Sequence, residues 1–342
     1  MAAPVQGWFD DRSGWSSLRK RLAARRVRGN SPLLYVGGLL AFLLVLQVAS
    51  GLLLLLHYQP NAAEAHASVA FIVGGIPYGA LVRSIHLWCS DLLVLTVIVQ
   101  LFSVAIRRAF RSPRELMWVS GLFSFFILLA FAFTGAVLPW SQDAYLQARV
   151  GSEIAGQMPV AGPLLRYIMR GGDEVTTATL RHAYGFHVAV LPAALTGLLF
   201  VHAVFLRRAM PEPTSERTPG TIPIYPDYLV RLGTVMTAAL VLVISLATFV
   251  ERPLGVAAEV TAAAPDGASP PWYLLFVHDL LLRAPPELLG VPSAKFIVGA
   301  GAVVILLAFF LPFFDRRGSR VTAALSALLL FAAVMLSIHA VL

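Results

Sequence analysis

The chain has 342 residues, of which 58% are hydrophobic and only 13% charged, a balance typical of an integral membrane protein. The net charge of +8 could suggest a nucleic-acid partner, but we expect none. The Lys and Arg residues gather in short stretches between apolar segments, where they serve as topology signals and contacts to membrane lipid. The single cysteine, Cys89, excludes an internal disulfide bond and a cysteine-based metal cluster.

Seven apolar stretches are each close to the ~20 residues that a helix needs to cross a membrane. We therefore expect an all-α integral membrane protein with seven transmembrane helices. If the helices alternate in direction, most Lys and Arg residues fall on one side, which the positive-inside rule places in the cytoplasm. The N-terminus is then cytoplasmic and the C-terminus lies on the outer side of the cell inner (plasma) membrane. In chain order the stretches are Leu33–His57, Leu81–Ile106, Met117–Trp140, Ala183–Leu206, Val230–Phe249, Phe296–Phe314 and Val321–Leu342.

A proline-rich connection after the fourth apolar stretch predicts the division of the chain into two membrane parts. Residues 1–32 are expected to form an amphipathic segment on the cytoplasmic side. Residues 33–209 would form a four-helix domain and residues 227–342 a three-helix domain. Residues 210–226 would link the two domains in the cytoplasm.

Histidine spacing is the strongest functional signal in the four-helix part. His86 and His187 lie near the starts of the second and fourth stretches, and His202 follows His187 near the far end of the fourth stretch. A step of 14 or 15 residues, such as that from His187 to His202, spans roughly 21–22 Å of helix and returns to nearly the same face. Two such helices, face to face, would hold two metallated rings, one near each side of the membrane. Gln100 stands about four helical turns after His86, where a matching fourth histidine would be expected.

Two glycine pairs repeat this spacing on the first and third stretches. Gly37 and Gly51 are separated by the same step as His86 and Gln100, and so are Gly121 and Gly135. Because glycine leaves room for a flat macrocycle beside the backbone, these helices are expected to wall a haem site whose iron His86 and His187 bind. Two arginines are further candidate cofactor-binding residues. Arg83, one turn from His86, could pair with a haem propionate, and Arg207 directly follows the fourth stretch.

Gln100 occupies the fourth of the four expected ligand positions, and a neutral amide is a poor iron ligand. Four alternatives are therefore open for the second ring. His202 could hold a five-coordinate haem, Gln100 could bind weakly, another sixth ligand could take its place, or no second haem could bind. Asp91, within the second stretch, is a candidate functional residue because a carboxylate at membrane depth is costly. It could face a cavity, take a proton or pair with an arginine.

Several short motifs resemble cytochrome b of the cytochrome bc and bf complexes, which are quinol–cytochrome c and quinol–plastocyanin oxidoreductases. The resemblance covers about residues 7–342 and is closest to the bf branch, whose paired histidines on the fourth helix have the spacing of His187 and His202. In chloroplasts that branch has two separate subunits, and here they look fused. The motifs are Trp8-Phe9-Asp10-Asp11-Arg12, Arg83-Ser84-Ile85-His86, Ser112-Pro113-Arg114-Glu115-Leu116, Leu138-Pro139-Trp140 and Thr179-Leu180.

The resemblance implies a haem-b-containing, quinone-reactive subunit of an electron-transfer complex. His86 and His187 resemble the ligands of the low-potential haem on the outer side, and His202 resembles a ligand of the high-potential haem on the inner side. Quinol would be oxidised at an outer pocket. The implied partners on other chains are a Rieske iron–sulfur protein and a c-type cytochrome, within a dimeric complex.

Three positions depart from the family pattern. Gln100 replaces a haem ligand. The outer Pro-Glu-Trp-Tyr motif reads Pro270-Pro271-Trp272-Tyr273 and so lacks the glutamate thought to take a quinol proton. Tyr35 replaces the cysteine that attaches an extra haem in the bf branch, so we expect no covalent haem.

Because a general base must reach the quinol hydroxyl, we expect His278 or Asp279 to accept the proton, with Trp272 and Tyr273 in the same pocket. Two other functions stay open. One is a non-bifurcating cytochrome b with one secure haem in another redox complex, and the other is a degenerate membrane anchor or assembly subunit.

Overall fold

The computed structural model describes residues 3–28, 34–209, 219–259, 270–317 and 319–339. Within these ranges seven helices are long and apolar enough to cross a membrane, which confirms the predicted all-α membrane fold. They are α3 (Val36–Leu55), α5 (Gly79–Ile106), α6 (Glu115–Val137), Thr177–Ala209 (built of α9, Thr177–Gly185, η2, Phe186–Val190, and α10, Leu191–Ala209), Ile224–Phe249 (η3, Ile224–Tyr228, and α11, Leu229–Phe249), α13 (Ser293–Phe314) and α14 (Arg320–His339).

The fourth span begins at Thr177, ahead of the predicted start at Ala183. Thr176 and Thr179 form a capping box, in which each side chain accepts a hydrogen bond from the backbone of the other. Such a box satisfies the amides that a helix start leaves unpaired. The first turn of α9 is therefore helical although its residues are polar, and the span begins earlier than its apolar residues alone predict.

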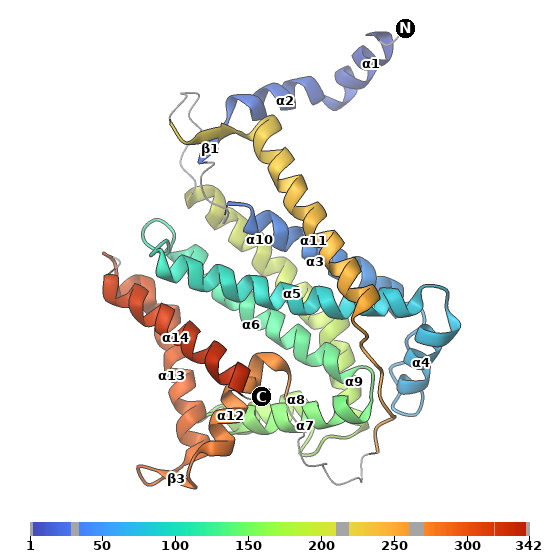
Figure 1. The fold of residues 1–342 in the computed structure, drawn as a ribbon, viewed down its shortest axis with the longest axis vertical. Coiled ribbons are helices and arrows are strands. Elements are labelled where there is room, and N and C mark those ends of the chain that lie inside the picture. Colours follow the sequence, from blue (N-terminus) through green and yellow to red (C-terminus); the bar gives the residue numbers. More distant parts are fainter. Residues whose placement is uncertain (1–2, 29–33, 210–218, 260–269, 318, 340–342) are drawn as a thin grey trace.

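The N-terminal segment lies at one end of the molecule. It holds α1 (Ala3–Ser13), α2 (Trp15–Ala24) and β1 (Arg26–Arg28), and Figure 1 places α1 and α2 at the end opposite α7 and α8. β1 pairs in antiparallel fashion with β2 (Thr221–Pro223), which follows residues 210–218 of the predicted linker. Those linker residues lie outside the described ranges. The pairing places the N-terminal segment beside the start of the fifth span, at the same end of the molecule (Figure 1).

The front four spans pack mainly as two pairs, α3 with α5 and α6 with α10. Leu43 of α3 and Leu93 of α5 are buried together with Cys89, whose thiol donates to the Leu43 carbonyl oxygen at 3.1 Å. Val243 of α11 completes this cluster. The cysteine is therefore a packing residue that fixes α3 against α5.

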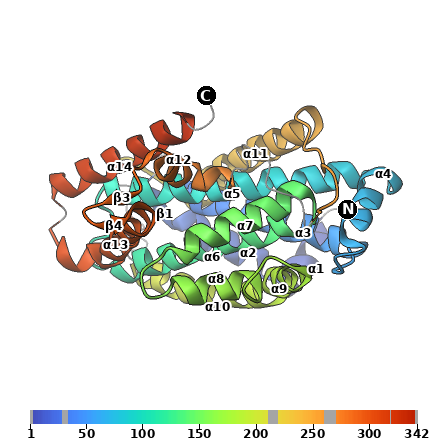
Figure 2. The ribbon, with the colours of Figure 1, turned by 90° about the horizontal axis from the view of Figure 1, so that it is seen from below.

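The last three spans lie against the outside of the front four. α11 packs on α5 and α3, α13 on α6, and α14 on α5, and Figure 2 shows α13 and α14 together at one flank. Trp118 of α6 donates its indole hydrogen to the Ala308 carbonyl oxygen of α13 at 2.6 Å. The connections between these spans hold η4 (Trp272–Leu274), α12 (Leu275–Arg283), β3 (Glu287–Leu288) and β4 (Val291–Pro292).

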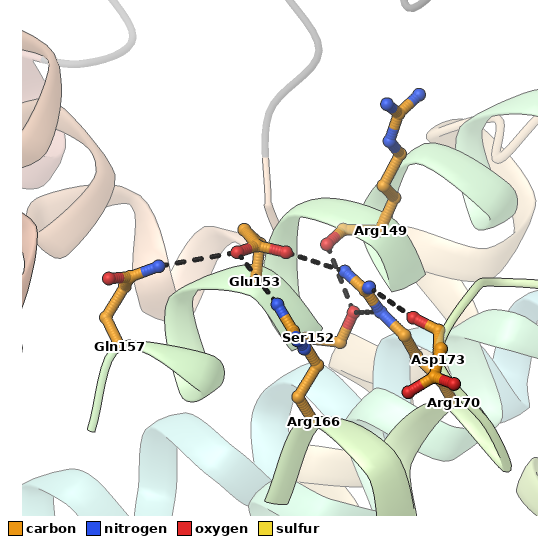
Figure 3. Close-up of polar contacts among 7 residues, drawn as sticks. All are labelled: Arg149, Ser152, Glu153, Gln157, Arg166, Arg170 and Asp173. Atoms are coloured by element: carbon orange, nitrogen blue, oxygen red, sulfur yellow. Dashed lines mark hydrogen bonds and ion pairs between the residues drawn. The ribbon is translucent and has the colours of Figure 1, made fainter. Parts of the chain in front are cut away.

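A buried arginine ties together the short helices that connect α6 to the fourth span, α7 (Gln142–Gly156) and α8 (Gly162–Arg170) (Figure 3). Arg170 is only 4% exposed. It donates to Ser152 Oγ at 2.8 Å, to the Asp173 carbonyl oxygen at 2.8 Å and to Glu153 Oε2 at 2.9 Å. Because a buried guanidinium is tolerated only when its donors are paired, this network fixes α8 on α7. The remaining short helix, α4 (Ala65–Gly75), precedes α5.

Candidate functional site

His86 of α5 and His187 of η2 lie opposite each other, with ring centroids 6.4 Å apart. Two imidazoles that bind one metal ion through bonds of about 2 Å place their donor nitrogens about 4 Å apart and their ring centres about 6 Å apart. The separation of the two rings therefore suits a single metal ion between them. The two residues that histidine spacing singles out on separate helices are brought together.

Hydroxyl groups fix which nitrogen of each ring carries the proton. Ser50 Oγ lies 3.0 Å from His86 Nδ1, and Thr134 Oγ1 lies 3.1 Å from His187 Nδ1. Each hydroxyl donates its hydrogen to a carbonyl of its own helix, at 2.8 Å from Ser50 and 2.7 Å from Thr134. It can therefore only accept from the imidazole, so Nδ1 carries the hydrogen and Nε2 carries the lone pair that a metal would take. Gln47 Nε2 donates to that lone pair of His86 at 3.1 Å.

His187 stands in a π-turn, which explains its unusual step to His202. The Leu191 amide donates to the Phe186 carbonyl oxygen, five residues back, and Pro192 has no amide hydrogen to offer the carbonyl of Val188. A π-turn takes about one residue more than an α-helical turn. The step from His187 to His202 is one position longer than the step from His86 to Gln100, and the π-turn absorbs this difference.

Two of the four predicted glycines make room for the histidine rings. A Cβ atom at Gly51 would lie 3.0 Å from His86 Cε1, and one at Gly135 would lie 2.8 Å from His187 Cε1. Both distances are shorter than carbon–carbon van der Waals contact. The sequence predicts that these glycines leave space for the edge of a macrocycle. In the structure, the atoms nearest to the two glycines are those of the imidazole rings, so the glycines make room for the histidines.

One cavity of about 370 Å³ is lined by both histidines, both of these glycines and Arg83, with mostly apolar side chains around them. A flat apolar ring with a metal at its centre and charged groups at its edge matches this lining, and the donor set is the one that low-spin haem uses. The residues at this end of the bundle therefore fit haem. The Arg83 guanidinium donates to the Arg252 carbonyl oxygen at 2.6 Å, and its predicted contact with a propionate stays a prediction.

The other end of the bundle has only part of a second site. Ser120 Oγ lies 2.8 Å from His202 Nδ1 and donates to a carbonyl of its own helix, so His202 has the same tautomer. Gln100 Oε1 is buried without a hydrogen-bond partner. The residue before Gly37 is Val36, whereas a hydroxyl residue precedes each of the other three glycines. This corner therefore lacks both the imidazole and the hydroxyl that would orient it.

The remaining residues at this end are more loosely arranged. A Cβ atom at Gly121 would lie 4.0 Å from His202 Cε1, and one at Gly37 would meet nothing within 4 Å. Arg207 is exposed at the end of α10. None of these residues lines the cavity that holds His86 and His187.

Trp272 and Tyr273, of the predicted outer pocket, lie beside Asp91 of α5. Trp272 Nε1 donates to Asp91 Oδ1 at 2.8 Å, and Arg252 forms an ion pair with Asp91 Oδ2. Of the three roles open to Asp91, pairing with an arginine is therefore observed. The Tyr273 hydroxyl is buried without a partner, and burial raises its pKa, with a smaller contribution from the negative charge of Asp91.

The other two residues predicted for this pocket lie on α12. Asp279 is buried, and its Oδ1 accepts from Arg283 at 2.8 Å and lies 3.7 Å from His339 Nδ1. Its Oδ2 is buried without a partner. His278 is half-buried. These contacts turn Asp279 toward α14, while the carboxylate that touches the motif belongs to Asp91.

The hydroxyl partners and Arg252 are the site residues that sequence reasoning missed. The signal for the hydroxyls was present, because Ser50, Ser120 and Thr134 each directly precede a glycine of the two pairs. No comparable signal links Arg252 to Asp91, which lies far away in the sequence.

Comparison with known proteins shows the family of the chain. Residues 29–210 match the family model described as cytochrome b/b6/petB. A cytochrome bc complex cytochrome b subunit from Chlorobaculum thiosulfatiphilum is 36% identical over 290 residues, which are 83% of this chain and 67% of the relative. Cytochrome b6 of Synechococcus elongatus is 34% identical over 205 residues, 60% of this chain and 95% of the relative.

A solved structure titled hyperthermophilic respiratory Complex III has the same fold. Its TM-score is 0.84 at 24% identity, and the match covers 98% of this chain and 91% of that chain. The b6 protein matches over nearly its whole length, whereas the longer bc-type relative also matches residues beyond that region. With its seven spans and its paired histidines, the chain belongs to the cytochrome b family of the bc- and b6f-type complexes.

Proposed function

We propose that the chain binds haem b between His86 and His187 and serves as the quinone-reactive electron-transfer subunit of a quinol–cytochrome c oxidoreductase-like complex. The observation that carries this proposal is the pair of imidazoles 6.4 Å apart, both held with the hydrogen on Nδ1 and the lone pair on Nε2. When bound, the haem supplies one-electron redox chemistry. The protein supplies ligands, position and a dry environment.

Each part of the cavity has a distinct task in this proposal. The Ser50 and Thr134 hydroxyls orient the rings, and Gly51 and Gly135 leave the space that the rings need. The apolar lining excludes water, which strengthens the electrostatic effect of nearby charges on the redox potential. Arg83 lines the cavity and supplies a positive charge for a propionate.

A second candidate function is a non-bifurcating cytochrome b with one secure haem. The observation that favours it is the absence at one corner of both the histidine and the hydroxyl, at Gln100 and Val36. His202 has the tautomer of a ligand, and in the first function it binds a second haem. Haem stoichiometry distinguishes these functions: two per chain supports the first, one supports the second, and none supports a membrane anchor or assembly subunit.

The same proposal includes the quinol pocket, the partner chains and the orientation in the membrane. Quinol is oxidised near Trp272 and Tyr273, with His278 or Asp279 in the pocket. The partner chains are a Rieske iron–sulfur protein, a c-type cytochrome or both, within a dimeric complex in the plasma membrane. The N-terminus is cytoplasmic, and the four-helix domain (33–209) and three-helix domain (227–342) are joined by the linker 210–226. The β1–β2 pairing supports a common side for the N-terminus and the linker.

A haem count on the purified chain tests the proposal. We expect His86→Leu and His187→Leu each to lose one b haem in a pyridine haemochrome assay, together with the low-spin visible spectrum. His57→Leu is a matched control, because His57 is exposed beyond the end of α3. Retention of full haem content in both ligand variants would refute the proposed site.

A further inference from the structure

A carboxylate inside the second membrane span contacts the predicted outer quinol pocket. Asp91 accepts a hydrogen bond from Trp272 Nε1 at 2.8 Å and forms an ion pair with Arg252. The Arg252 guanidinium also stacks over the Trp88 ring, 4.2 Å from its centroid. Three segments far apart in the chain therefore meet around this carboxylate.

Asp91 lies at the edge of the histidine cavity. Ser90 and Leu87, one and four residues earlier on α5, both line it. Residues four apart on a helix lie on the same face, so Asp91 and Leu87 are neighbours on the helix surface. The Arg83 guanidinium, which also lines the cavity, donates to the Arg252 carbonyl oxygen at 2.6 Å. The ion pair is therefore connected to the cavity wall by direct contacts.

The carboxylate has unused acceptor capacity. An ionised carboxylate has about four lone-pair sites, and the contacts to Trp272 and Arg252 take one on each oxygen. The Asp91 side chain is 28% exposed, so a small molecule can reach it. The nearby Tyr273 hydroxyl is buried without a partner and stays protonated because its pKa is raised, so it can donate to an oxygen of the same ligand.

We propose that Asp91 is the proton acceptor for quinol in the outer pocket, in place of the carboxylate that Pro271 does not provide. This inference rests on the proposed function. In the first one-electron step, one of the two quinol O–H bonds breaks, its proton forms a new O–H bond on Asp91 Oδ1, and one electron passes to a one-electron acceptor, the iron–sulfur protein. The ion pair with Arg252 and the hydrogen bond from Trp272 hold the carboxylate at the pocket.

The position of Asp279 makes it the less suitable acceptor. Its side chain is only 6% exposed, and Arg283 occupies Oδ1. Among the described contacts, those of Asp279 run to its own helix and to His339 of α14 rather than to the Trp272–Tyr273 segment. Asp91, in contrast, touches that segment directly.

Quinol oxidation by the purified complex tests the inference, with haem content and visible spectrum recorded for every variant. We expect Asp91→Asn to lower kcat by at least about tenfold, because positioned proton transfer contributes roughly 10²–10⁴-fold. Asp91→Glu should retain most of the rate. The exposed neighbour Glu251 provides a matched loss of a carboxylate, and Glu251→Gln should keep the full rate.

A second-site variant separates proton transfer from mere anchoring. Pro271→Glu in the Asp91→Asn background places a carboxylate on the motif itself, and we expect it to restore turnover. A chain whose only defect is a lost anchor for Trp272 gains nothing from this change. Slow turnover in the double variant therefore overturns the inference, as does an unchanged rate in Asp91→Asn. Failure of the wild-type complex to oxidise any quinol refutes the proposed function instead.

Discussion

Replacement of Gly135 by alanine is the most direct perturbation of the histidine cavity. The added Cβ would lie 2.8 Å from His187 Cε1, about 0.7 Å inside a normal carbon–carbon contact of about 3.5 Å. A binding constellation must be held within about 0.5 Å of its working geometry. The ring must therefore move by more than the site tolerates, or the added methyl must strain α6.

Overpacking of this kind costs about 1–3 kcal/mol, which corresponds to roughly a 5- to 150-fold loss of haem affinity. The assay is haem retained per chain during dilution in detergent, followed by the visible spectrum. We expect faster haem loss and a weaker low-spin spectrum. Gly197→Ala is the control, because nothing lies within 4 Å of the Cβ position and alanine favours the helix. Native retention in Gly135→Ala would refute the reasoning.

Four further predictions concern the orienting hydroxyl, the incomplete corner, the short helices and a buried phenol. Thr134→Val leaves the His187 Nδ1 hydrogen without an acceptor, so we expect haem binding to weaken by about 1–3 kcal/mol in equilibrium titration. Gln100→His combined with Val36→Ser should complete the fourth corner and raise the low-spin haem signal more than Gln100→His alone. Arg170→Met removes three hydrogen bonds and should lower the free energy of unfolding by about 3 kcal/mol in a denaturant titration. Burial raises the pKa of Tyr58, so the stability it contributes is complete below pH ~10 and is lost as pH rises further, a decline that Tyr58→Phe should reduce.

Two control variants distinguish the orienting hydroxyl and the buried arginine from similar residues elsewhere in the chain. Thr96→Val removes a hydroxyl that bonds only to its own helix, so it should leave haem affinity unchanged. Arg166→Ala removes a half-exposed ion pair and should cost less than about 1 kcal/mol. Equal effects of Arg166→Ala and Arg170→Met would contradict the anchoring role of the buried arginine. An unchanged spectrum in the double variant at Gln100 and Val36 would contradict the idea that a histidine and its hydroxyl partner are what this position lacks.

Most of the fold and the principal histidines could be predicted from the sequence, because both depend on periodicity. The seven apolar stretches predict the seven spans, and the helical repeat brings His86 opposite His187. Span ends were less accurate where polar residues extend a helix, as at Thr177, although the capping pattern could have been recognised. The π-turn at His187 depends on hydrogen-bond geometry near Pro192, which spacing alone does not reveal.

Polar contacts between distant segments were the part that could not be predicted. Serine and threonine in membrane helices usually bond back to their own carbonyls, so the place of Ser50 and Thr134 before a glycine marks them in the sequence but does not reveal that a histidine is their partner. Here they make that bond and accept from a histidine as well. The partner of Asp91 depends on where the segment after α11 returns, and no local pattern encodes that position.

The short β1–β2 ribbon has a consequence for expression of the two membrane parts as separate polypeptides. Arg26–Arg28 belongs to the segment before the first span, and Thr221–Pro223 leads into the fifth. A polypeptide cut within residues 210–218 would keep both strands, one on each fragment. Two co-expressed fragments would therefore each bring one strand of this pairing, whose register aligns the N-terminal segment with the start of the fifth span.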